Sequence, residues 1–358
     1  MDLATKVALV KEVGEEIITE EELLTLFETK KHPVAYDGFE PSGTLHIAQG
    51  LLRAININKM IKAGCKFIML AADWHAWANN KLGGDLEKIR KTGDYMVEVW
   101  KACGMNLDNV TFKRSYDLVT KEDYWKTVIQ ISRLNTIPRL VRCAQIMGRE
   151  EHEELHGSQL LYPCMQAADI FVLGVDIAQL GMDQRKVNML AREVAPRLGY
   201  EKPVCVHHHM LMGLGQPPSL ELTGPERAIA LKMSKSKPET AIFMTDTAEQ
   251  VTQKIRNAYC PMRQIEDNPV MEYARYIIFQ KYPSMTIKRP AKWGGELNIH
   301  SYTELVNLYM ADKIHPMDLK ASVAEYTNQL LDPVRKHFEK NKKATKLLEE
   351  VKSFEVTR

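Results

Sequence analysis

Residues 34–50 read VAYDGFEPSGTLHIAQG, and this stretch decides the fold of the chain. The apolar run 34–36 predicts a strand, the glycines after it predict a tight turn, and the apolar residues that recur at helical spacing over 48–55 predict a helix. Such a turn directs unpaired N–H groups and the positive end of the helix dipole at one spot. Gly38 and Gly43 allow a phosphate to approach the main chain there.

Two polar side chains, His46 and Gln49, follow the glycine turn and are three residues apart. We expect both in the first turn of the helix, where they can donate hydrogen bonds to the same phosphate. Taken alone, the segment is also explained by a histidine that caps a surface helix. The choice between the two interpretations depends on the rest of the chain.

A second candidate for phosphate binding is KMSKS, residues 232–236, which follows a loop rich in glycine and proline. Lys232 and Lys235 offer two positive charges, and Ser234 and Ser236 offer two hydroxyls. Lysine suits a moving phosphate clamp because it is a point charge on a flexible stem. A solvated basic loop would explain this segment alone, but the two segments together predict a nucleotide site.

These two segments resemble the His-Ile-Gly-His and Lys-Met-Ser-Lys-Ser signatures of class I aminoacyl-tRNA synthetases. The second signature is matched in full, whereas the first has Ala48 for its glycine and Gln49 for its second histidine. Gln49 keeps a hydrogen-bond donor but carries no charge, so its phosphate contact should be weaker. The resemblance implies ATP with Mg²⁺ as a substrate and no protein-bound metal. It assigns catalysis to His46, Gln49, Lys232 and Lys235, and further ATP contacts to Gly38, Gly43, Asp183, Ser234 and Ser236.

Three more stretches are similar to tyrosyl-tRNA synthetases of the archaeal and eukaryotic cytosolic type. They are LYPCMQAAD at 161–169, GMDQRK at 181–186 and HPMDLK at 315–320. The resemblance extends from about residue 30 to the C-terminus. It implies a ligase that activates L-tyrosine with ATP to tyrosyl-adenylate and transfers it to the 3′ end of tRNA(Tyr).

The first of these stretches places Tyr162, Gln166 and Asp169 at i, i+4 and i+7, on one face of an apolar helix. Polar groups on an inward face need partners, and a satisfied core network would supply them. The resemblance implies a substrate instead. It assigns the phenol hydroxyl of tyrosine to Tyr36 and Asp169, its ammonium group to Tyr162, Gln166 and Gln184, and the ribose or amino group to Asp183.

The alternation of strand-like and helical patterns predicts an α/β fold with a parallel sheet. The predicted strands are 34–36, 66–71, 109–113, 175–178 and 203–206. The resemblance implies a Rossmann-like catalytic domain with a helical insert, followed by an α-helical C-terminal domain. We therefore expect an N-terminal helical extension at 1–30, the catalytic domain at 31–245 with a dimer-forming insert at about 115–155, and an anticodon-binding domain at 246–358.

The resemblance also implies a set of residues that bind tRNA: Arg185, Lys186, Trp293, His315 and Asp318. In this assignment Asp318 accepts a hydrogen bond from the first anticodon base, a guanine, and Trp293 stacks on it, as expected for unpaired RNA bases. A simpler explanation remains for Asp318. At the start of a helix, a carboxylate stabilises the exposed N–H groups without any ligand.

Composition limits the class of protein. The 358 residues carry a net charge of +2, with 45% hydrophobic and 26% charged residues, as in ordinary soluble globular proteins. A nearly neutral chain must bind tRNA through a local surface. No apolar run is long enough to span a membrane, and the N-terminus lacks a secretory pattern. We expect a soluble cytoplasmic homodimer with no membrane or DNA partner.

Cysteine and histidine patterns argue against a metal centre. The six cysteines are scattered with no Cys-x-x-Cys pair, which favours reduced thiols over zinc or disulfides. Three consecutive histidines, 207–209, end a predicted strand, where alternate side chains point to opposite faces. We therefore expect no metal site at these histidines.

Three alternatives to this interpretation stay open at this stage. A tryptophanyl-tRNA synthetase shares the fold and both signatures, although an indole pocket has no obvious use for both Tyr36 and Asp169. A small-molecule nucleotidyltransferase would share the histidine turn but would not need the C-terminal half. A non-catalytic RNA-binding relative would not need Lys232 and Lys235.

Overall fold

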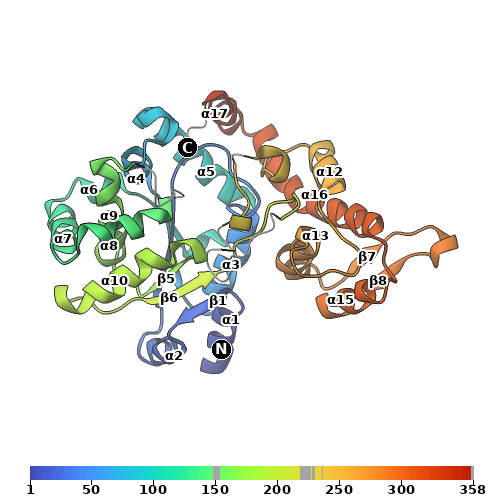
Figure 1. Ribbon diagram of the computed structural model, residues 1–358, viewed down its shortest axis with the longest axis horizontal. Coiled ribbons are helices and arrows are strands. Elements are labelled where there is room, and N and C mark those ends of the chain that lie inside the picture. Colours follow the sequence, from blue (N-terminus) through green and yellow to red (C-terminus); the bar gives the residue numbers. More distant parts are fainter. Residues whose placement is uncertain (148–153, 218–226, 228–229, 236, 356–358) are drawn as a thin grey trace.

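The computed structural model of the chain describes residues 1–147, 154–217, 227, 230–235 and 237–355. Within these ranges, no helix combines the length and the apolar character that a membrane span requires. An α/β part built on one large sheet lies beside a mainly helical C-terminal part (Figure 1). The predicted fold class is therefore confirmed.

The central sheet has six strands in the order β1-β6-β5-β2-β3-β4. All neighbours are parallel except the edge strand β1, which is antiparallel to β6. The five strands predicted from apolar runs all belong to this sheet. The strand bounds are β1 Gly14–Ile18, β2 Val34–Phe39, β3 Lys66–Ala71, β4 Val110–Arg114, β5 Ile177–Gly181 and β6 Val204–His208.

Helices cover both faces of the sheet, and the strands alternate between two cores. Ala35 and Ile177 belong to the core on one face, whereas their neighbours Tyr36 and Ala178 belong to the core on the other. Alternation follows from the pleat, which sends successive side chains to opposite faces. The first face packs against α1 Leu3–Lys11, α3 Leu51–Lys62 and α5 Leu86–Ala102, and the second against α7 Glu122–Arg133, α8 Ile137–Ala144, α9 Gly157–Val172 and α10 Arg185–Leu198.

The N-terminal 30 residues are more than the helical extension expected from the sequence. They form α1, strand β1 and α2 (Glu20–Thr29), and β1 extends the sheet by pairing with β6. The glutamates of β1 hide the strand in the sequence, because they break the apolar run. In the structure Glu16 is paired with Arg185 at 2.8 Å and with His207 Nδ1 at 2.8 Å.

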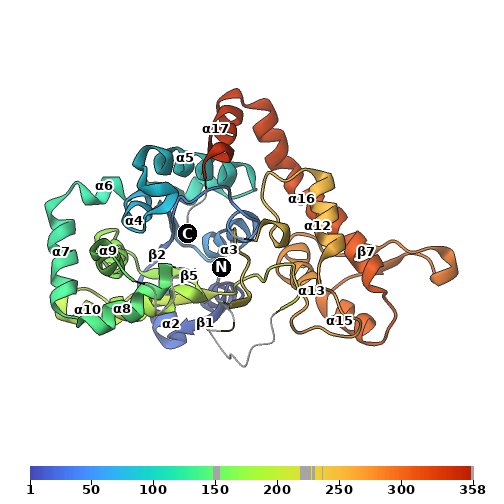
Figure 2. The same cartoon turned by 45° about the horizontal axis from the view of Figure 1, so that its top comes forward.

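The C-terminal part is dominated by the long helix α16, Pro316–Lys340, which begins where the sequence predicts. His315 caps this helix, because its Nδ1 accepts a hydrogen bond of 3.2 Å from the Met317 N–H. The last helix, α17 (Lys342–Ser353), returns from the end of α16 to lie beside α5 of the α/β part (Figures 1 and 2). The two parts are thus joined at the C-terminus as well as at residues 237–248.

Shorter elements complete the fold. In the α/β part they are α4 Asp73–Ala78, α6 Tyr116–Val119 and the short helices η1 Lys81–Gly84, η2 Leu107–Asn109, η3 Gln145–Met147, η4 Met182–Gln184 and η5 Pro238–Thr240. The C-terminal part adds α12 Ala248–Asn257, α13 Pro269–Tyr273, η6 Ala274–Ile278, α14 Phe279–Lys281, β7 Met285–Ile287, η7 Ala291–Trp293, β8 Leu297–Ile299 and α15 Tyr302–Met310.

Candidate active site

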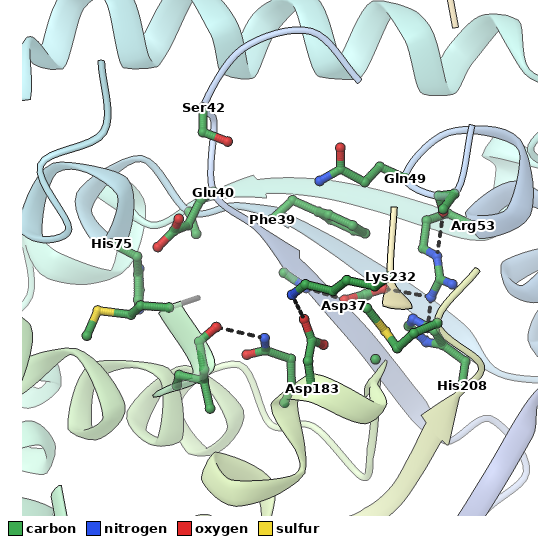
Figure 3. Close-up of a pocket in the computed structure, with 18 of the residues that line it drawn as sticks. Asp37, Phe39, Glu40, Ser42, Gln49, Arg53, His75, Asp183, His208 and Lys232 are labelled. Atoms are coloured by element: carbon green, nitrogen blue, oxygen red, sulfur yellow. Dashed lines mark hydrogen bonds and ion pairs between the residues drawn. The ribbon is translucent and has the colours of Figure 1, made fainter. Parts of the chain in front are cut away.

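A pocket of about 750 Å³ opens at the carboxyl ends of β2, β5 and β6 (Figure 3). Its lining comes from β2 and the turn after it, from α4 and α9, and from the loop of residues 232–235. Parallel α/β sheets bind their ligands at this edge. The structure therefore brings the two signature segments of the sequence into one pocket.

The histidine turn differs from the expected geometry, because α3 begins at Leu51 and leaves His46 and Gln49 in the turn before it. The backbone of this turn pairs with residues 242–244 instead: the Ile47 N–H donates to the Ile242 carbonyl at 2.8 Å, and His46 forms a bridge with Phe243. The expectation that His46 and Gln49 lie in the first helical turn is wrong for this reason. Both side chains still line the pocket.

His46 is buried, and its electrostatic surroundings keep it neutral. Burial lowers its pKa well below the ordinary value, and the cations of Lys235, Lys232 and Arg53 lower it further. In the described part of the chain, His46 Nδ1 and Gln49 Oε1 have no hydrogen-bond partner. Both residues line the pocket, so a ligand bound there can supply the missing partners.

The two lysines of the second signature face opposite walls of the pocket. Lys232 Nζ lies 2.7 Å from Asp183 Oδ2 (Figure 3), and Lys235 Nζ donates to Ser42 Oγ at 3.2 Å and to the Gly43 carbonyl at 3.3 Å. Burial and the nearby charge of Lys81 lower the pKa of Lys235 to about 7. The loop is thereby connected to the glycine turn on one side and to η4 on the other.

The other residues predicted to contact ATP do not all lie in the described pocket lining. Ser234 and Gly38 line the pocket, and a side chain at Gly38 would lie 3.4 Å from the ring of Tyr36. Gly43 has a φ of 122°, which a residue with a side chain rarely adopts. Ser236 lies outside the described residues.

Another part of the pocket lining is formed by the polar face of α9. Tyr162, Gln166 and Asp169 are buried and line the pocket together with Tyr36, so the predicted common face exists. Gln166 Nε2 donates to Gln184 Oε1 at 3.1 Å. Burial raises the pKa of Tyr36 well above its ordinary value, and the charges of Asp169 and Asp37 raise it further, so the phenol stays neutral.

Asp169 is held by two residues that the sequence reasoning missed, His75 and Tyr124. His75 Nε2 lies 3.0 Å from Asp169 Oδ2, and Tyr124 Oη donates to Asp169 Oδ1 at 3.1 Å. Burial alone would lower the pKa of His75, but the attraction of Asp169 outweighs it and raises the pKa. Neither residue belongs to a spaced motif, and no signal in the sequence connects them with Asp169.

A buried charged network that the sequence did not predict forms the floor of the pocket. Arg53 contacts His208 Nδ1 and lies 3.5 Å from Asp37 Oδ2 (Figure 3). Gln179 Nε2 lies 2.5 Å from the same ring nitrogen. Burial raises the pKa of Asp37 to about 7 against the attraction of Arg53. Burial and Arg53 lower the pKa of His208 far below its ordinary value, so its ring is a neutral acceptor.

The three consecutive histidines have three different sets of partners. His208 joins the pocket floor, whereas His207 Nδ1 lies 2.8 Å from Glu16 and His209 stacks on Tyr276. In the described ranges, no three His, Cys, Asp or Glu side chains are grouped as metal ligands would be.

A third lysine, Lys81, also lines the pocket and was missed because it lies in a short loop without periodicity. Lys81 Nζ is 3.9 Å from Glu40 Oε2, and Asn79 Nδ2 donates to Glu40 Oε1 at 3.0 Å. Three lysines, Lys81, Lys232 and Lys235, thus surround one end of the pocket. That end is suited to a polyanion such as a triphosphate.

The candidate tRNA residues are divided between two places. Arg185 and Lys186 begin α10 directly after the pocket residues of η4, and they contact Glu16 and Gln145 respectively. His315 and Asp318 lie at the start of α16 in the other part of the molecule. The side chain of Trp293 is outside the described atoms.

Comparison with known proteins gives a consistent result. Residues 28–332 match the family model described as class I tRNA synthetases (W and Y). The chain is 48% identical over 353 residues to "Tyrosine--tRNA ligase 1, cytoplasmic" of Arabidopsis thaliana, covering 98% of this chain and 89% of that protein. It is 44% identical over 372 residues to "Tyrosine--tRNA ligase" of Thermococcus gammatolerans, covering 98% and 99%.

Solved structures agree with these relatives. The tyrosyl-tRNA synthetase of Pyrococcus horikoshii, complexed with L-tyrosine, has a TM-score of 0.91 and 41% identity, with 98% of this chain and 100% of that chain covered. The tryptophanyl-tRNA synthetase of Aeropyrum pernix has a TM-score of 0.67 at 19% identity, with 95% and 85% covered. This second likeness shows the fold alone.

Proposed function

Because the chain belongs to the class I tRNA synthetases of the tryptophan and tyrosine family, we propose that it acts as a tyrosine–tRNA ligase through the pocket described above. One observation carries the choice of amino acid. Tyr36 and Asp169 are both buried, line the same pocket and are close enough for the charge of Asp169 to raise the pKa of the Tyr36 phenol, so together they suit a phenol hydroxyl. An indole ring offers only one N–H donor and would leave part of this pair unsatisfied.

The reaction proceeds in two displacement steps. The tyrosine carboxylate attacks the α-phosphorus of Mg·ATP, and pyrophosphate leaves as tyrosyl-adenylate forms. A ribose hydroxyl at the 3′ end of tRNA then attacks the activated carbonyl, and AMP leaves. Neither step needs a protein nucleophile, so the pocket accelerates the reaction by positioning and by stabilising charge.

The phosphate end supplies the charge. Lys232, Lys235 and Lys81 face the triphosphate, and neutral His46 and Gln49 donate hydrogen bonds to it. Lys232 must exchange its ion pair with Asp183 for the phosphates, which frees Asp183 for the ribose or the amino group. Magnesium enters as part of the substrate Mg·ATP and is held by the phosphates.

The tyrosine end supplies the orientation. Asp169 accepts from the phenol hydroxyl and Tyr36 completes the pair, while Tyr162, Gln166 and Gln184 hold the ammonium group. In the described structure Gln166 and Gln184 are already hydrogen-bonded to each other, and Gln184 Nε2 is fixed by the Ile146 carbonyl at 3.1 Å. Little movement is then needed when tyrosine binds, which reduces the entropy cost of binding.

The remaining parts of the molecule serve tRNA and assembly in this proposal. The helical domain at 246–358 reads the anticodon through Asp318, His315 and Trp293, and Arg185 and Lys186 contact the acceptor end.

The insert at about 115–155 forms the interface of a homodimer in this proposal. Exposed apolar side chains support this interface, since Ile129 is 51% and Ile137 68% accessible. The free state of the six cysteines supports a cytoplasmic setting.

ATP–pyrophosphate exchange, measured with each amino acid in turn, tests the proposed function. We expect exchange with tyrosine and at least a hundredfold less exchange with tryptophan. A factor of about one hundred corresponds to the loss of roughly two hydrogen bonds. Exchange that prefers tryptophan would assign the chain to the other branch of the family. Exchange with no amino acid would make it a non-catalytic relative.

A further inference from the structure

The C-terminal end of the chain reaches the loop that carries Lys81. After α17, Phe354 packs against a small apolar cluster made of Ala76, Leu82 and Ile89. Leu82 directly follows Lys81 in the sequence. An aromatic residue near the C-terminus therefore packs against an apolar cluster that includes Leu82, the immediate neighbour of Lys81.

The backbone of this loop is strained at Leu82. Asn80, Leu82, Gly83 and Gly84 all have positive φ angles of 55°, 52°, 69° and 74°. Glycine and asparagine tolerate this region, but it is unfavourable for a residue with a larger side chain such as leucine. Residues in such conformations persist only where the surroundings hold them. Leu82 is held by burial, since its side chain is only 4% accessible.

Among the side chains of the cluster around Leu82, Phe354 is the one that is distant in sequence. Ala76 and Ile89 flank the loop in sequence, whereas Phe354 arrives from the helical part through α16 and α17. Two further contacts fix its position: Lys88 Nζ lies 5.9 Å from the centre of its ring, and Glu350 on α17 pairs with Lys91 on α5 at 2.9 Å. The two views agree that α17 lies along α5 (Figures 1 and 2).

We propose that Phe354 is a positioning residue for ATP: by covering Leu82 it holds the 80–84 loop in the conformation that directs Lys81 into the pocket. The inference rests on the proposed role of Lys81 at the triphosphate. It gives the C-terminal segment a place in the adenylation reaction, although the segment belongs to the tRNA-binding half of the molecule. Phe354 touches no substrate and acts only through Leu82 and Lys81.

Steady-state pyrophosphate exchange with separate titrations of ATP and tyrosine tests the proposal. Phe354→Ala should raise the KM for ATP roughly tenfold and should leave the KM for tyrosine within about twofold. The effect on ATP is smaller than the ~10²-fold loss that a 1 Å misplacement of a reacting group can cause, because Phe354 acts indirectly. Phe354→Leu keeps an apolar cover over Leu82 and should restore most of the loss. Leu348→Ala is the matched control, because Leu348 lies on the preceding helix α17 and, in the described structure, packs against the main core but not against the cluster of Ala76, Leu82 and Ile89.

A double-mutant cycle decides whether Phe354 acts through Lys81. Lys81→Ala alone should raise the KM for ATP, and adding Phe354→Ala to it should cause no further increase. Additive effects, equal effects of Phe354→Ala and Leu348→Ala, or a parallel rise in the KM for tyrosine would each overturn the proposal. A Lys81→Ala enzyme with unchanged ATP kinetics would also overturn it. The proposed function is tested separately: it would be contradicted if the unsubstituted protein showed no pyrophosphate exchange.

Discussion

The two ends of the pocket are built in different ways. The tyrosine end is composed of strand β2 and helix α9, and its polar side chains already have fixed partners, as Asp169 does in His75 and Tyr124. The phosphate end is assembled from three segments that are far apart in sequence, and His46 and Gln49 keep atoms there without partners in the described structure. Under the proposed function, we therefore expect recognition of the amino acid to depend on a preorganised network and the reaction rate to depend on charges that must adjust.

This difference predicts different kinetic signatures. An alteration at the preorganised end should change the choice between amino acids, because one substrate satisfies the buried groups and another leaves them unpaired. An alteration at the adjustable end should change the rate with little effect on amino-acid binding, because the charge there is used mainly as pyrophosphate departs. Substitutions at each end test whether the two ends are functionally separate.

The largest effect should come from the lysine loop. Lys235→Ala should lower the adenylation rate by ~10² to 10³, the loss typical of one transition-state charge contact, and leave tyrosine affinity nearly unchanged. Single-turnover measurement of tyrosyl-adenylate formation gives both quantities. Lys237→Ala, which removes an exposed lysine two residues further on, is the control. If Lys235→Ala formed adenylate at the normal rate, the loop would lie outside the chemistry.

The next effect belongs to the tyrosine end. Asp169→Asn or Tyr36→Phe should reduce the preference for tyrosine over phenylalanine by at least about tenfold, because one hydrogen bond to a charged group contributes ~1.5 to 3 kcal/mol. Exchange rates with the two amino acids measure this preference. Tyr124→Phe removes a support of Asp169 that does not line the pocket, and it should cause a smaller loss. Equal losses with both amino acids would show that these residues are structural.

Asp318 tests the separation of the two halves of the chain. Asp318→Ala should weaken aminoacylation of tRNA by roughly 1 to 3 kcal/mol, by analogy with single base contacts in DNA, and should leave pyrophosphate exchange unchanged. Asp332→Ala removes an exposed carboxylate further along the same helix and serves as the control. A joint fall of both activities with a lower melting temperature would make Asp318 a plain helix-start carboxylate, next to the cap that His315 already provides.

Much of the fold was predictable because its strands are apolar runs. The five buried parallel strands stand out for this reason, whereas β1 escapes because Glu15 and Glu16 interrupt it and find their partners far away in sequence. The signature residues were predictable as members of one site because they belong to short motifs, and the structure places them in the same pocket. Where the prediction went wrong, at His46 and Gln49, a tertiary bridge to residues 242–244 delays the start of the helix.

The missed site residues share one cause. His75, Lys81, Tyr124 and Arg53 belong to segments whose spacing carries no signal. The tertiary fold brings His75, Lys81 and Arg53 to the pocket lining and Tyr124 to the carboxylate of Asp169. A network such as Asp37 with Arg53 and His208 joins three segments and is invisible to any local pattern. Side chains that support other side chains, and a pocket residue outside any motif such as Lys81, are therefore found from the structure.

The smallest predicted effect is a pH dependence of the KM for ATP that the KM for tyrosine should not share. The pKa of Lys235 is about 7, so its charged fraction falls from about a half at pH 7 to about a tenth at pH 8. ATP needs the charged form, and apparent affinity scales with the competent fraction, so the KM for ATP should rise about fivefold over this interval. The KM for tyrosine should stay level, because the phenol of Tyr36 remains neutral.

Two substitutions identify the group responsible for this pH dependence. Lys235→Arg keeps a charge at every working pH and should flatten the profile for ATP. Asp37, the other pocket group with a pKa of about 7, gains negative charge over the same interval and would also weaken ATP binding. Asp37→Asn should nevertheless leave most of the slope, because Lys235 faces the phosphates directly while the charge of Asp37 is opposed by Arg53. A flat profile in Asp37→Asn together with an unchanged slope in Lys235→Arg would assign the effect to the pocket floor and would place the adjustable charge of this site at Asp37.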